Sequence, residues 1–290
     1  MAEKLIGIIG GSGLYEMEGL KKVQEVEITT PFGKPSGVFI KGQLGDASLV
    51  FLPRHGVGHS ISPSEINYRA NIYGFKKLGV QELVSFSAVG SMREDIHPGH
   101  LVVIDQFIDR TRSRNSSFFE DGCVAHVAFA DPVCLSLKAV LLKAARGVGT
   151  TVHDGGAYLC IEGPQFSTRA ESLMYRSTST RVIGMTNLPE ARLAREAELC
   201  YGTVALVTDF DCWHETEEDV GVQAIMEVIK QNVSRAKKVI QRISESISSK
   251  TACSCSLALK HAVVTNPNMI PLATRQKLSL FLDKYLKERP

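Results

Sequence analysis

The sequence predicts one α/β domain in which helices flank a central mixed β-sheet. Short unbroken apolar runs, such as residues 5–9 and 203–207, are bounded by turn or polar residues, which is typical of strands buried on both faces. Segments with apolar residues at helical spacing separate these runs, so strands and helices alternate along the chain. The length of 290 residues suits one large α/β domain or two small ones and can bury a substantial core.

The composition is that of an ordinary soluble globular protein, with 44% hydrophobic and 22% charged residues. The net charge of +2 gives no reason to expect a nucleic-acid or anionic-membrane partner. No apolar run is long enough to span a bilayer, and glycines interrupt the short N-terminal run, which lacks a signal-peptide cleavage site. We therefore expect a cytoplasmic protein.

In the first half of the chain, strands are expected at residues 4–9, 47–53, 82–86 and 101–104. A capping box at residues 62–65, with Pro63 at the first helical position, predicts a helix that ends near Leu78. Asp131 as the N-cap predicts a second helix over residues 132–146. These elements fit a strand–helix alternation.

In the second half, further strands are expected at residues 157–161, 181–184 and 203–207. Residues 109–122 are polar and predict a surface loop before them. Helices are expected to begin near Thr168, to cover residues 189–199, and to present an apolar stripe over residues 222–233. The tail, about residues 249–290, is expected to be helical in part and to act as a cap or an interface element.

Two loops of small residues are candidates for binding an anion through backbone N–H groups. Residues 10–14 follow the first strand and include the Ser12 hydroxyl. Neither the dinucleotide-binding glycine pattern nor the Walker pattern is complete there, since Glu16 stands at the third glycine position. Residues 87–91 form the second candidate loop. A plain turn at the end of a strand is an equally good interpretation of the first loop.

Several single side chains have two interpretations. Arg54 and His55 end a buried strand, where they suit a phosphate group, although a surface salt bridge beside a structural His is the more common arrangement. Phe166 could stack on a flat heterocycle or pack in the core. His126 stands alone and receives no role from its surroundings in the sequence.

Asp209 and Asp211 follow the buried run at residues 203–207. If the chain stays extended, both side chains point to the same side, at the edge where open α/β sheets bind their ligands. Such a pair can accept from a group that offers two donors, or hold a proton for a leaving group. The alternative is that one Asp caps a helix starting near Glu217 while the other is solvated.

The seven cysteines show no zinc-site spacing with the histidines, and their odd number favours free, mostly buried thiols. Cys253 and Cys255 form a Cys-x-Cys pair. A redox or disulfide role stays open for this pair, although a bond between the two would close a strained small ring. We expect two thiols and no metal.

Several motifs occur in a fixed order: residues 7–13, 54–56, 87–91, 161–171, 184–186 and 208–213, together with 30–36 and 105–111. In this order they resemble the trimeric purine nucleoside phosphorylase family, and within it the branch that cleaves 5'-deoxy-5'-methylthioadenosine. The resemblance covers roughly residues 5–240. The number of motifs in register makes it specific.

The resemblance implies that residues 1–290 form a single domain with the nucleoside phosphorylase fold. The implied reaction is phosphorolysis of methylthioadenosine to adenine and 5-methylthioribose 1-phosphate, in methionine and purine salvage. Inorganic phosphate would be a co-substrate, with no metal or organic cofactor. The residues implied at the phosphate are Ser12, Arg54, His55, Ser87, Ala88 and Thr186.

The same resemblance implies that Asp209 and Asp211 meet the purine N7 and the 6-amino group. A 6-amino group donates hydrogen bonds and suits carboxylates, whereas a 6-oxo group would leave a buried polar group unpaired at a cost of about 1–3 kcal/mol. Asp209 is the expected general acid at N7, a role that requires burial and the neighbouring Asp211 to raise its pKa. The other residues implied at the substrate are Met185 along the ribose, Phe166 and Ser167 near the base, and His126, Val222 and Ile225 at the 5' position.

Some positions depart from the family pattern. Ser87 and Val89 stand where Thr and Cys are frequent, and Gln165 stands where Arg is frequent. Two other functions stay open, namely a phosphorylase of other purine nucleosides (6-oxo or 5'-hydroxy) and a non-catalytic nucleoside-binding protein. The family also implies a homotrimer or a homohexamer, with sites near the subunit boundaries.

Overall fold

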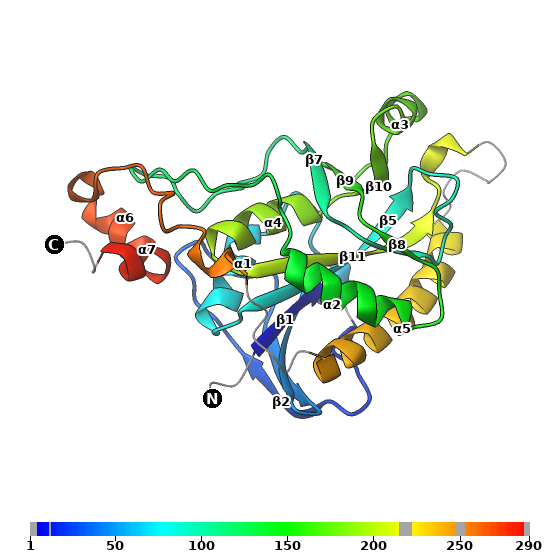
Figure 1. Ribbon diagram of the computed structural model, residues 1–290, viewed down its shortest axis with the longest axis horizontal. Coiled ribbons are helices and arrows are strands. Elements are labelled where there is room, and N and C mark those ends of the chain that lie inside the picture. The colour runs from blue at the N-terminus through cyan, green and yellow to red at the C-terminus, as the bar shows by residue number, and fades with distance from the viewer. Residues whose placement is uncertain (1–4, 12, 215–221, 247–252, 287–290) are drawn as a thin grey trace.

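The computed structural model describes residues 5–11, 13–214, 222–246 and 253–286 (Figure 1). In this part of the chain, eleven strands form one mixed β-sheet, which confirms the predicted α/β class. The strands are β1 (Leu5–Gly10), β2 (Lys21–Val26), β3 (Phe39–Leu44), β4 (Ala47–Pro53), β5 (Glu82–Ser91), β6 (Leu101–Val103), β7 (Gln106–Arg110), β8 (Val152–Asp154), β9 (Ala157–Ile161), β10 (Thr180–Gly184) and β11 (Cys200–Asp209).

Strands β5 and β11 lie side by side within the sheet. The hydrogen-bonded order is β2-β3-β4-β1-β5-β10-β9-β7, while β11 pairs with β5 and β6, and β6 also pairs with β8. β1 is parallel to β4 and β5, and β5 is parallel to β11. Because parallel strands share the edge at which they end, the residues that follow β1, β4, β5 and β11 gather along one edge of the sheet.

Helices cover both faces of the sheet (Figure 1). Ile6 and Ile8 of β1 pack in a core with α2 and α5, whereas Ile9 packs in a second core with α1 and α4. Successive side chains of a strand point to opposite faces, so a strand covered on both faces is apolar throughout. The helices are α1 (Tyr68–Lys77), α2 (Leu135–Arg146), α3 (Arg169–Arg176), α4 (Asn187–Glu196), α5 (Val222–Ser246), α6 (Leu272–Lys277) and α7 (Ser279–Leu286).

The C-terminal segment, residues 253–286, packs against the core that contains α1 and α4. The short 3₁₀ turns η3 (Cys255–Leu257) and η4 (Pro267–Met269) precede α6 and α7, so the tail is helical in part, as predicted. Phe281 of α7 is buried in the core that also contains Phe118. Among the helices that the structure describes, none is both long enough and apolar enough to cross a membrane.

Helix α1 begins later than predicted. One of the expected capping-box contacts forms, since Glu65 Oε2 accepts from the Ser62 backbone N–H at 3.2 Å, but it closes only a turn. The helix begins at Tyr68 because Asn67 is the N-cap, with its side-chain oxygen accepting from the Ala70 N–H. The side-chain amide of Asn67 therefore caps the helix in place of the predicted cap, Ser62.

Helix α2 also begins later, at Leu135, and Asp131 is not its N-cap. The N-cap is Cys134, whose backbone N–H donates to the carbonyl of Tyr201 at 2.8 Å. This bond holds the chain in an extended conformation beside the first residues of β11, so the helix cannot start earlier.

The small residues 87–91 are not a loop, contrary to the prediction, but the second half of β5. They pair with β11 as far as Gly90, which lies opposite Asp209, and with β10 beyond it. Four other strands were not predicted, namely β2, β3, β7 and β8. β2 is almost wholly exposed and therefore carries no apolar run that would identify it.

Candidate active site

The predicted carboxylate pair lies where β11 ends. Asp209 is the last residue of β11, and Asp211 opens the 3₁₀ turn η2 (Asp211–Trp213). The Asp211 backbone N–H donates to Asp209 Oδ1 at 2.8 Å, and the Thr208 hydroxyl donates to Asp209 Oδ2 at 2.6 Å. The chain therefore turns after Asp209, so the condition that it stays extended past the strand is not met. Asp211 adopts the left-handed conformation with φ 52°.

Asp211 is the more deeply buried member of the pair. It is 8% exposed, whereas Asp209 is half-buried. The Ser172 hydroxyl, from helix α3, donates to Asp211 Oδ2. Burial raises the pKa of Asp211 and the charge of Asp209 raises it further, and these effects outweigh the hydrogen bond from Ser172. Within the pair, Asp211 is thus the carboxyl group whose pKa is raised.

Gly90 of β5 makes room for both acids. A Cβ atom at this position would lie 2.8 Å from Asp209 Oδ1 and 3.3 Å from Asp211 Cβ. It would also lie 3.1 Å from Ile183 of β10. Only glycine therefore allows the pair to sit against the central strand in this arrangement.

Three hydroxyl groups meet further back along β5. Ser87 Oγ lies 3.4 Å from Thr186 Oγ1 and 3.2 Å from the hydroxyl of Tyr158. Ser87 precedes Gly90 by three residues, which is about 10 Å along a strand. Ala88 is exposed although β5 has neighbours on both sides, so this edge of the sheet is open to solvent. The structure thus brings Ser87, Ala88 and Thr186 together.

Arg54 follows β4 and is 2% exposed. Its guanidinium forms a two-point ion pair with Glu190 of α4 and donates to the carbonyl of Phe86 at 2.9 Å and to Ser85 Oγ at 2.6 Å. Burial alone would lower the pKa of Arg54, but the carboxylate of Glu190 outweighs burial and raises it. The pair is buried and is not the surface salt bridge of the alternative interpretation. Arg54 is a permanent cation whose charge is largely balanced.

The surroundings of His55 favour the neutral imidazole. Burial lowers the pKa of His55 to about 4, with a further contribution from the charge of Arg54. Its Nδ1 lies 2.9 Å from the carbonyl oxygen of Ile61, which can only accept, so the proton of the neutral ring is on Nδ1. The ring also stacks on His59, with centroids 4.1 Å apart. Nε2 is then the nitrogen that remains available to a ligand.

The turn at Gly163 and Pro164 lies beside the end of β10. Gly163 packs so closely against Met185 that a Cβ atom on this glycine would overlap the Met185 sulfur. Phe166 is 60% exposed, which excludes the alternative that it is a packed core residue. The Ser167 carbonyl accepts from Cys212, next to Asp211, at 3.3 Å, and the buried Ser167 hydroxyl has no hydrogen-bond partner among the residues that the structure describes. Ser167 and Met185 therefore lie at the same edge as the carboxylates and the hydroxyls.

Arg114 fixes this edge and was missed by sequence reasoning, which assigned residues 109–122 to a surface loop. Its side chain is 2% exposed, and its guanidinium donates to the carbonyls of Met185 and Glu162 and to the hydroxyl of Tyr68. A single Arg in a polar stretch gives no signal in the sequence. The Arg114 side chain connects the loop to Met185, the residue that is predicted to lie along the ribose.

The carboxylate of Glu162 completes this connection. It accepts from the Ser64 hydroxyl and from the backbone N–H groups of Arg112 and Ser113, and it pairs with Arg114. Burial acts to raise the pKa of Glu162, but these hydrogen bonds and the charge of Arg114 outweigh it and lower the pKa to about 2. Glu162 is therefore an ionised structural anchor.

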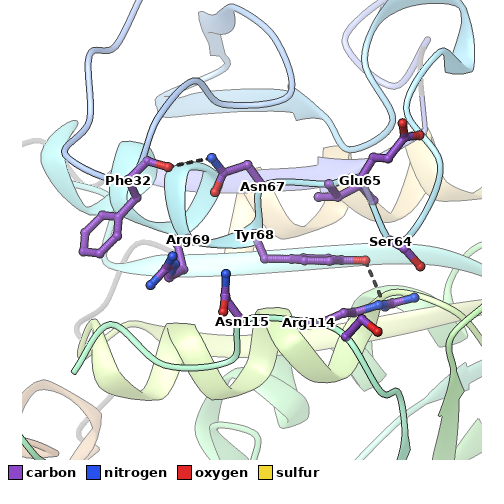
Figure 2. Close-up of a pocket in the computed structure, with 10 residues that line it drawn as sticks. Phe32, Ser64, Glu65, Asn67, Tyr68, Arg69, Arg114 and Asn115 are labelled. Atoms are coloured by element: carbon purple, nitrogen blue, oxygen red, sulfur yellow. Dashed lines mark hydrogen bonds between the residues drawn. The ribbon is translucent and has the colours of Figure 1, made fainter. Parts of the chain in front are cut away.

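A cavity of about 280 Å³ lies behind this anchor, bounded by Phe32 and by residues 64–69 and 113–115. Figure 2 shows Tyr68 and Arg114 on its wall, joined by a hydrogen bond. Of the predicted site residues whose side chains the structure describes, none lines it. The carboxylate pair does not line this cavity, and Arg114 on its wall donates to the carbonyl of Met185.

Four predicted residues are not joined to this site. Ser12 lies outside the described residues, as do the side chains of Val222 and Ile225 and the helix start expected near residue 217. His126 is exposed, and its backbone N–H donates to the carbonyl of Ala262 at 2.8 Å. The structure places His126 against the C-terminal segment and away from the edge formed by β5 and β11.

A family model described as the phosphorylase superfamily matches residues 5–245. The chain belongs to this superfamily. The match covers the sheet, the carboxylate pair and helix α5, and it confirms the family and the fold that the motifs predict. The chain is also similar in sequence and in structure to methylthioadenosine phosphorylases over nearly its whole length.

One similar protein is the S-methyl-5'-thioadenosine phosphorylase of Geobacter sulfurreducens, which is 57% identical over 98% of this chain and 100% of its own length. A methylthioadenosine phosphorylase sourced from an antarctic soil metagenomic library has a crystal structure with a TM-score of 0.93 and 45% identity, covering 97% of this phosphorylase and 100% of that chain. The methylthioadenosine phosphorylase of Schistosoma mansoni, solved in complex with adenine, has a TM-score of 0.82 and 34% identity over 98% and 100% of the two chains.

Proposed function

We propose that this chain is a pentosyltransferase that cleaves 5'-deoxy-5'-methylthioadenosine with inorganic phosphate, giving adenine and 5-methylthioribose 1-phosphate. The observation that carries the proposal is the Asp209–Asp211 pair at the end of β11, about 10 Å along the adjacent strand from the hydroxyls of Ser87 and Thr186. The names of the similar proteins support the substrate.

The reaction is a displacement at C1' of the ribosyl group. A phosphate oxygen attacks C1', the bond from C1' to N9 of adenine breaks, and its electron pair stays on the base. The base must gain a proton at N7 to leave as neutral adenine, and Asp209 is the proposed donor. Phosphate is the nucleophile and Asp209 the acid, so the proposed reaction requires neither a metal nor an organic cofactor.

The pair also sets the preference for adenine. Asp211, held by Ser172, presents an acceptor to the exocyclic 6-amino group, and a 6-oxo group in its place would leave buried polar groups unpaired. That mismatch costs about 1–3 kcal/mol, or roughly one to two decades in relative rate. The exposed ring of Phe166 and the unpartnered hydroxyl of Ser167 are available to the base.

The proposed phosphate site consists of the Ser87 and Thr186 hydroxyls, the Ala88 N–H, His55 and Arg54, with Ser12 outside the described residues. Because Glu190 balances much of the charge of Arg54, the hydroxyls and backbone donors contribute a larger share of the affinity. Met185, fixed by Arg114, is proposed to lie along the ribose between this site and the base.

We also propose a homotrimer or a dimer of trimers. His126 is exposed and lies with the C-terminal segment, so it can line the 5' pocket only of a neighbouring subunit. Val222 and Ile225 of helix α5 are the proposed contributions of the same chain to that pocket. Light scattering of the purified protein tests the assembly, and a stable monomer would contradict it.

The activity is tested by measuring free adenine released from methylthioadenosine with and without phosphate. Adenosine and inosine, assayed in parallel, separate this function from phosphorolysis of 5'-hydroxy and 6-oxopurine nucleosides. Binding of methylthioadenosine without phosphate-dependent turnover would identify a non-catalytic nucleoside-binding protein instead.

A further inference from the structure

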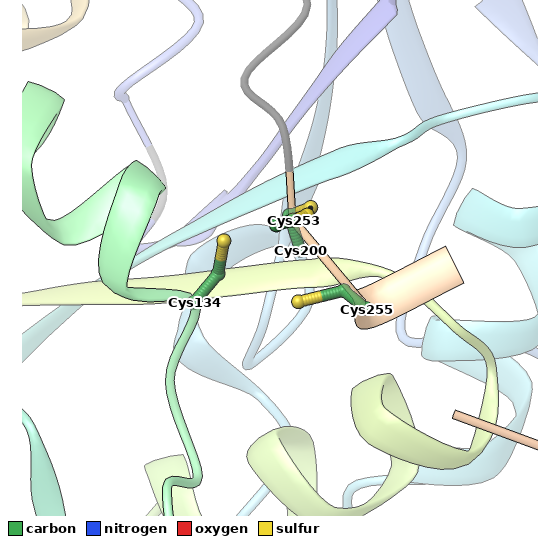
Figure 3. A group of neighbouring side chains, drawn as sticks. All are labelled: Cys134, Cys200, Cys253 and Cys255. Atoms are coloured by element: carbon green, nitrogen blue, oxygen red, sulfur yellow. Dashed lines mark hydrogen bonds between the residues drawn. The ribbon is translucent and has the colours of Figure 1, made fainter. Parts of the chain in front are cut away.

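Four cysteines from three separate segments meet at one point (Figure 3). We call Cys134, Cys200, Cys253 and Cys255 the cysteine cluster. Cys134 is the N-cap of α2, Cys200 is the first residue of β11, and the other two begin the C-terminal segment. All four sulfur atoms lie within 4.8 Å of one another.

We propose that the cysteine cluster is a structural zinc site that fastens the C-terminal segment to α2 and β11. Zinc bound by four thiolates is tetrahedral, with bonds of about 2.3 Å, which places the sulfurs about 3.8 Å apart. The sulfur separations run from 3.2 Å, between Cys200 and Cys253, to at most 4.8 Å, so zinc binding needs one pair to widen by about 0.6 Å and others to contract by about 1 Å at most. Four sulfur ligands in a tetrahedral arrangement favour zinc or iron over magnesium, calcium and manganese, and elemental analysis separates zinc from iron.

The mutual approach of all four sulfurs distinguishes this site from a set of disulfides. Two disulfides require only two close pairs, and none of the cysteines within the described residues is bonded to another. Cys200 Sγ and Cys253 Sγ lie 3.2 Å apart, while a bond between Cys253 and Cys255 would close a strained small ring. A single ion uses all four sulfurs without such a ring.

The surroundings suit a closed structural site. Cys134 and Cys255 are buried in the core formed with α2 and α5, and Cys200 and Cys253 pack against that core while remaining half-buried. The apolar side chains exclude water, and the half-buried pair leaves a path for the ion to enter. Cys134 sits at the N-terminus of the twelve-residue helix α2, where the helix dipole favours the thiolate form.

The position of the cluster assigns it a structural role. Cys200 begins β11 and Asp209 ends it, so nine residues, or about 30 Å of strand, separate the ion from the carboxylate pair. The ion instead links residues 134 and 200 to the start of the C-terminal segment. Helix α7 of this segment packs through Phe281 into the core that contains α1 and α4. Loss of the ion is therefore expected to loosen the tail before it affects the chemistry.

The proposal is tested on untagged full-length protein, purified with reductant and dialysed against a weak chelator. We expect about one zinc per chain by elemental analysis, and the free thiols titrated under native conditions should rise by up to four when a strong chelator removes it. The melting temperature should fall when the chelator removes the zinc and should rise again when zinc is restored. Cobalt(II) added to the metal-free protein should give the thiolate charge-transfer absorption of a tetrahedral sulfur site.

Cys255→Ser should lose the zinc and the cobalt spectrum, whereas Cys123→Ser, which changes a buried cysteine outside the cluster, should keep both. The cobalt titration of the unmodified chain does not depend on whether a variant folds. The proposal is overturned if the reduced protein holds no zinc and its cobalt adduct lacks thiolate absorption. Recovery of the cluster as disulfides from protein kept under reductant would overturn it equally.

Discussion

Replacing Gly90 with alanine tests whether the central strand positions the two carboxylates. The added Cβ would lie 2.8 Å from Asp209 Oδ1, while ordinary contacts begin at 3.4 Å, so the carboxylate must move by about 0.6 Å. The backbone of Gly90 is paired with β11 and β10 and cannot move instead. Misplacement of a reacting group by about 1 Å can cost on the order of 100-fold in rate, so we expect Gly90→Ala to lose about 10- to 100-fold in kcat/KM.

The assay is phosphate-dependent adenine release from methylthioadenosine, with the melting temperature measured in parallel. Overpacking of a core costs about 1–3 kcal/mol, so the variant should fold. Gly37→Ala is the matched control, since its Cβ would meet only Pro53, at 3.5 Å, and the backbone there needs no left-handed conformation. Activity of Gly90→Ala within twofold of Gly37→Ala would show that the carboxylate positions do not matter to the reaction.

Three further predictions address the acid, the imidazole and the tail. Asp209→Asn should keep the fold and lose at least about 100-fold in kcat, since general acid catalysis contributes about 10²–10⁴-fold; a loss below fivefold would remove Asp209 from the role of acid. Because the pKa of His55 is lowered from 6.5 to about 4, the folded state favours the neutral ring, and stability that is complete above pH 6.5 should fall by up to about 3 kcal/mol as the pH drops to 4. Denaturant titrations across that range should show a flatter profile for His55→Gln, and an unchanged slope would contradict the assignment. Phe281→Ala, which removes a ring in edge contact with Tyr73, should cost about 3–5 kcal/mol of unfolding free energy in the same titrations, whereas a cost below 1 kcal/mol would mean that the tail is not part of the core.

Strands with both faces covered could be predicted from the sequence, because burial on both faces requires an apolar residue at nearly every position. β1, β4, β9 and β10 were located within a residue or two for this reason. β2 is exposed along its length and looks like a polar loop, and the second half of β5 is built of small residues that look like a turn. Their strand conformation comes from pairing with neighbours that are distant in the sequence.

The ends of strands were also good guides to the candidate site. Arg54, Ser87, Thr186 and Asp209 lie at the same edge of the sheet, and each belongs to a short motif that local chemistry marks. Glu190 could not be predicted as the partner of Arg54, since 136 residues separate them and a Glu within a helix is unremarkable.

The Arg114 anchor and the cysteine cluster were missed for a related reason. Arg114 is a lone cation in a polar loop, and its partners lie on helix α1 (Tyr68) and on the loop after β9 (Glu162). The cysteines have no spacing typical of zinc, because the fold, and not a local loop, brings residues 134, 200 and 253 together. The cysteine cluster forms only when the fold places the N-terminus of α2, the start of β11 and the start of the C-terminal segment side by side.

The central claim is tested most directly by adenine release from methylthioadenosine in the presence and absence of inorganic phosphate, with adenosine and inosine as competing substrates. We expect release that requires phosphate and that is fastest with methylthioadenosine. A preference for inosine would mean that the carboxylate pair does not select a 6-amino group. Release without phosphate would mean hydrolysis, and the phosphate site built from Ser87, Thr186 and Arg54 would then be wrong.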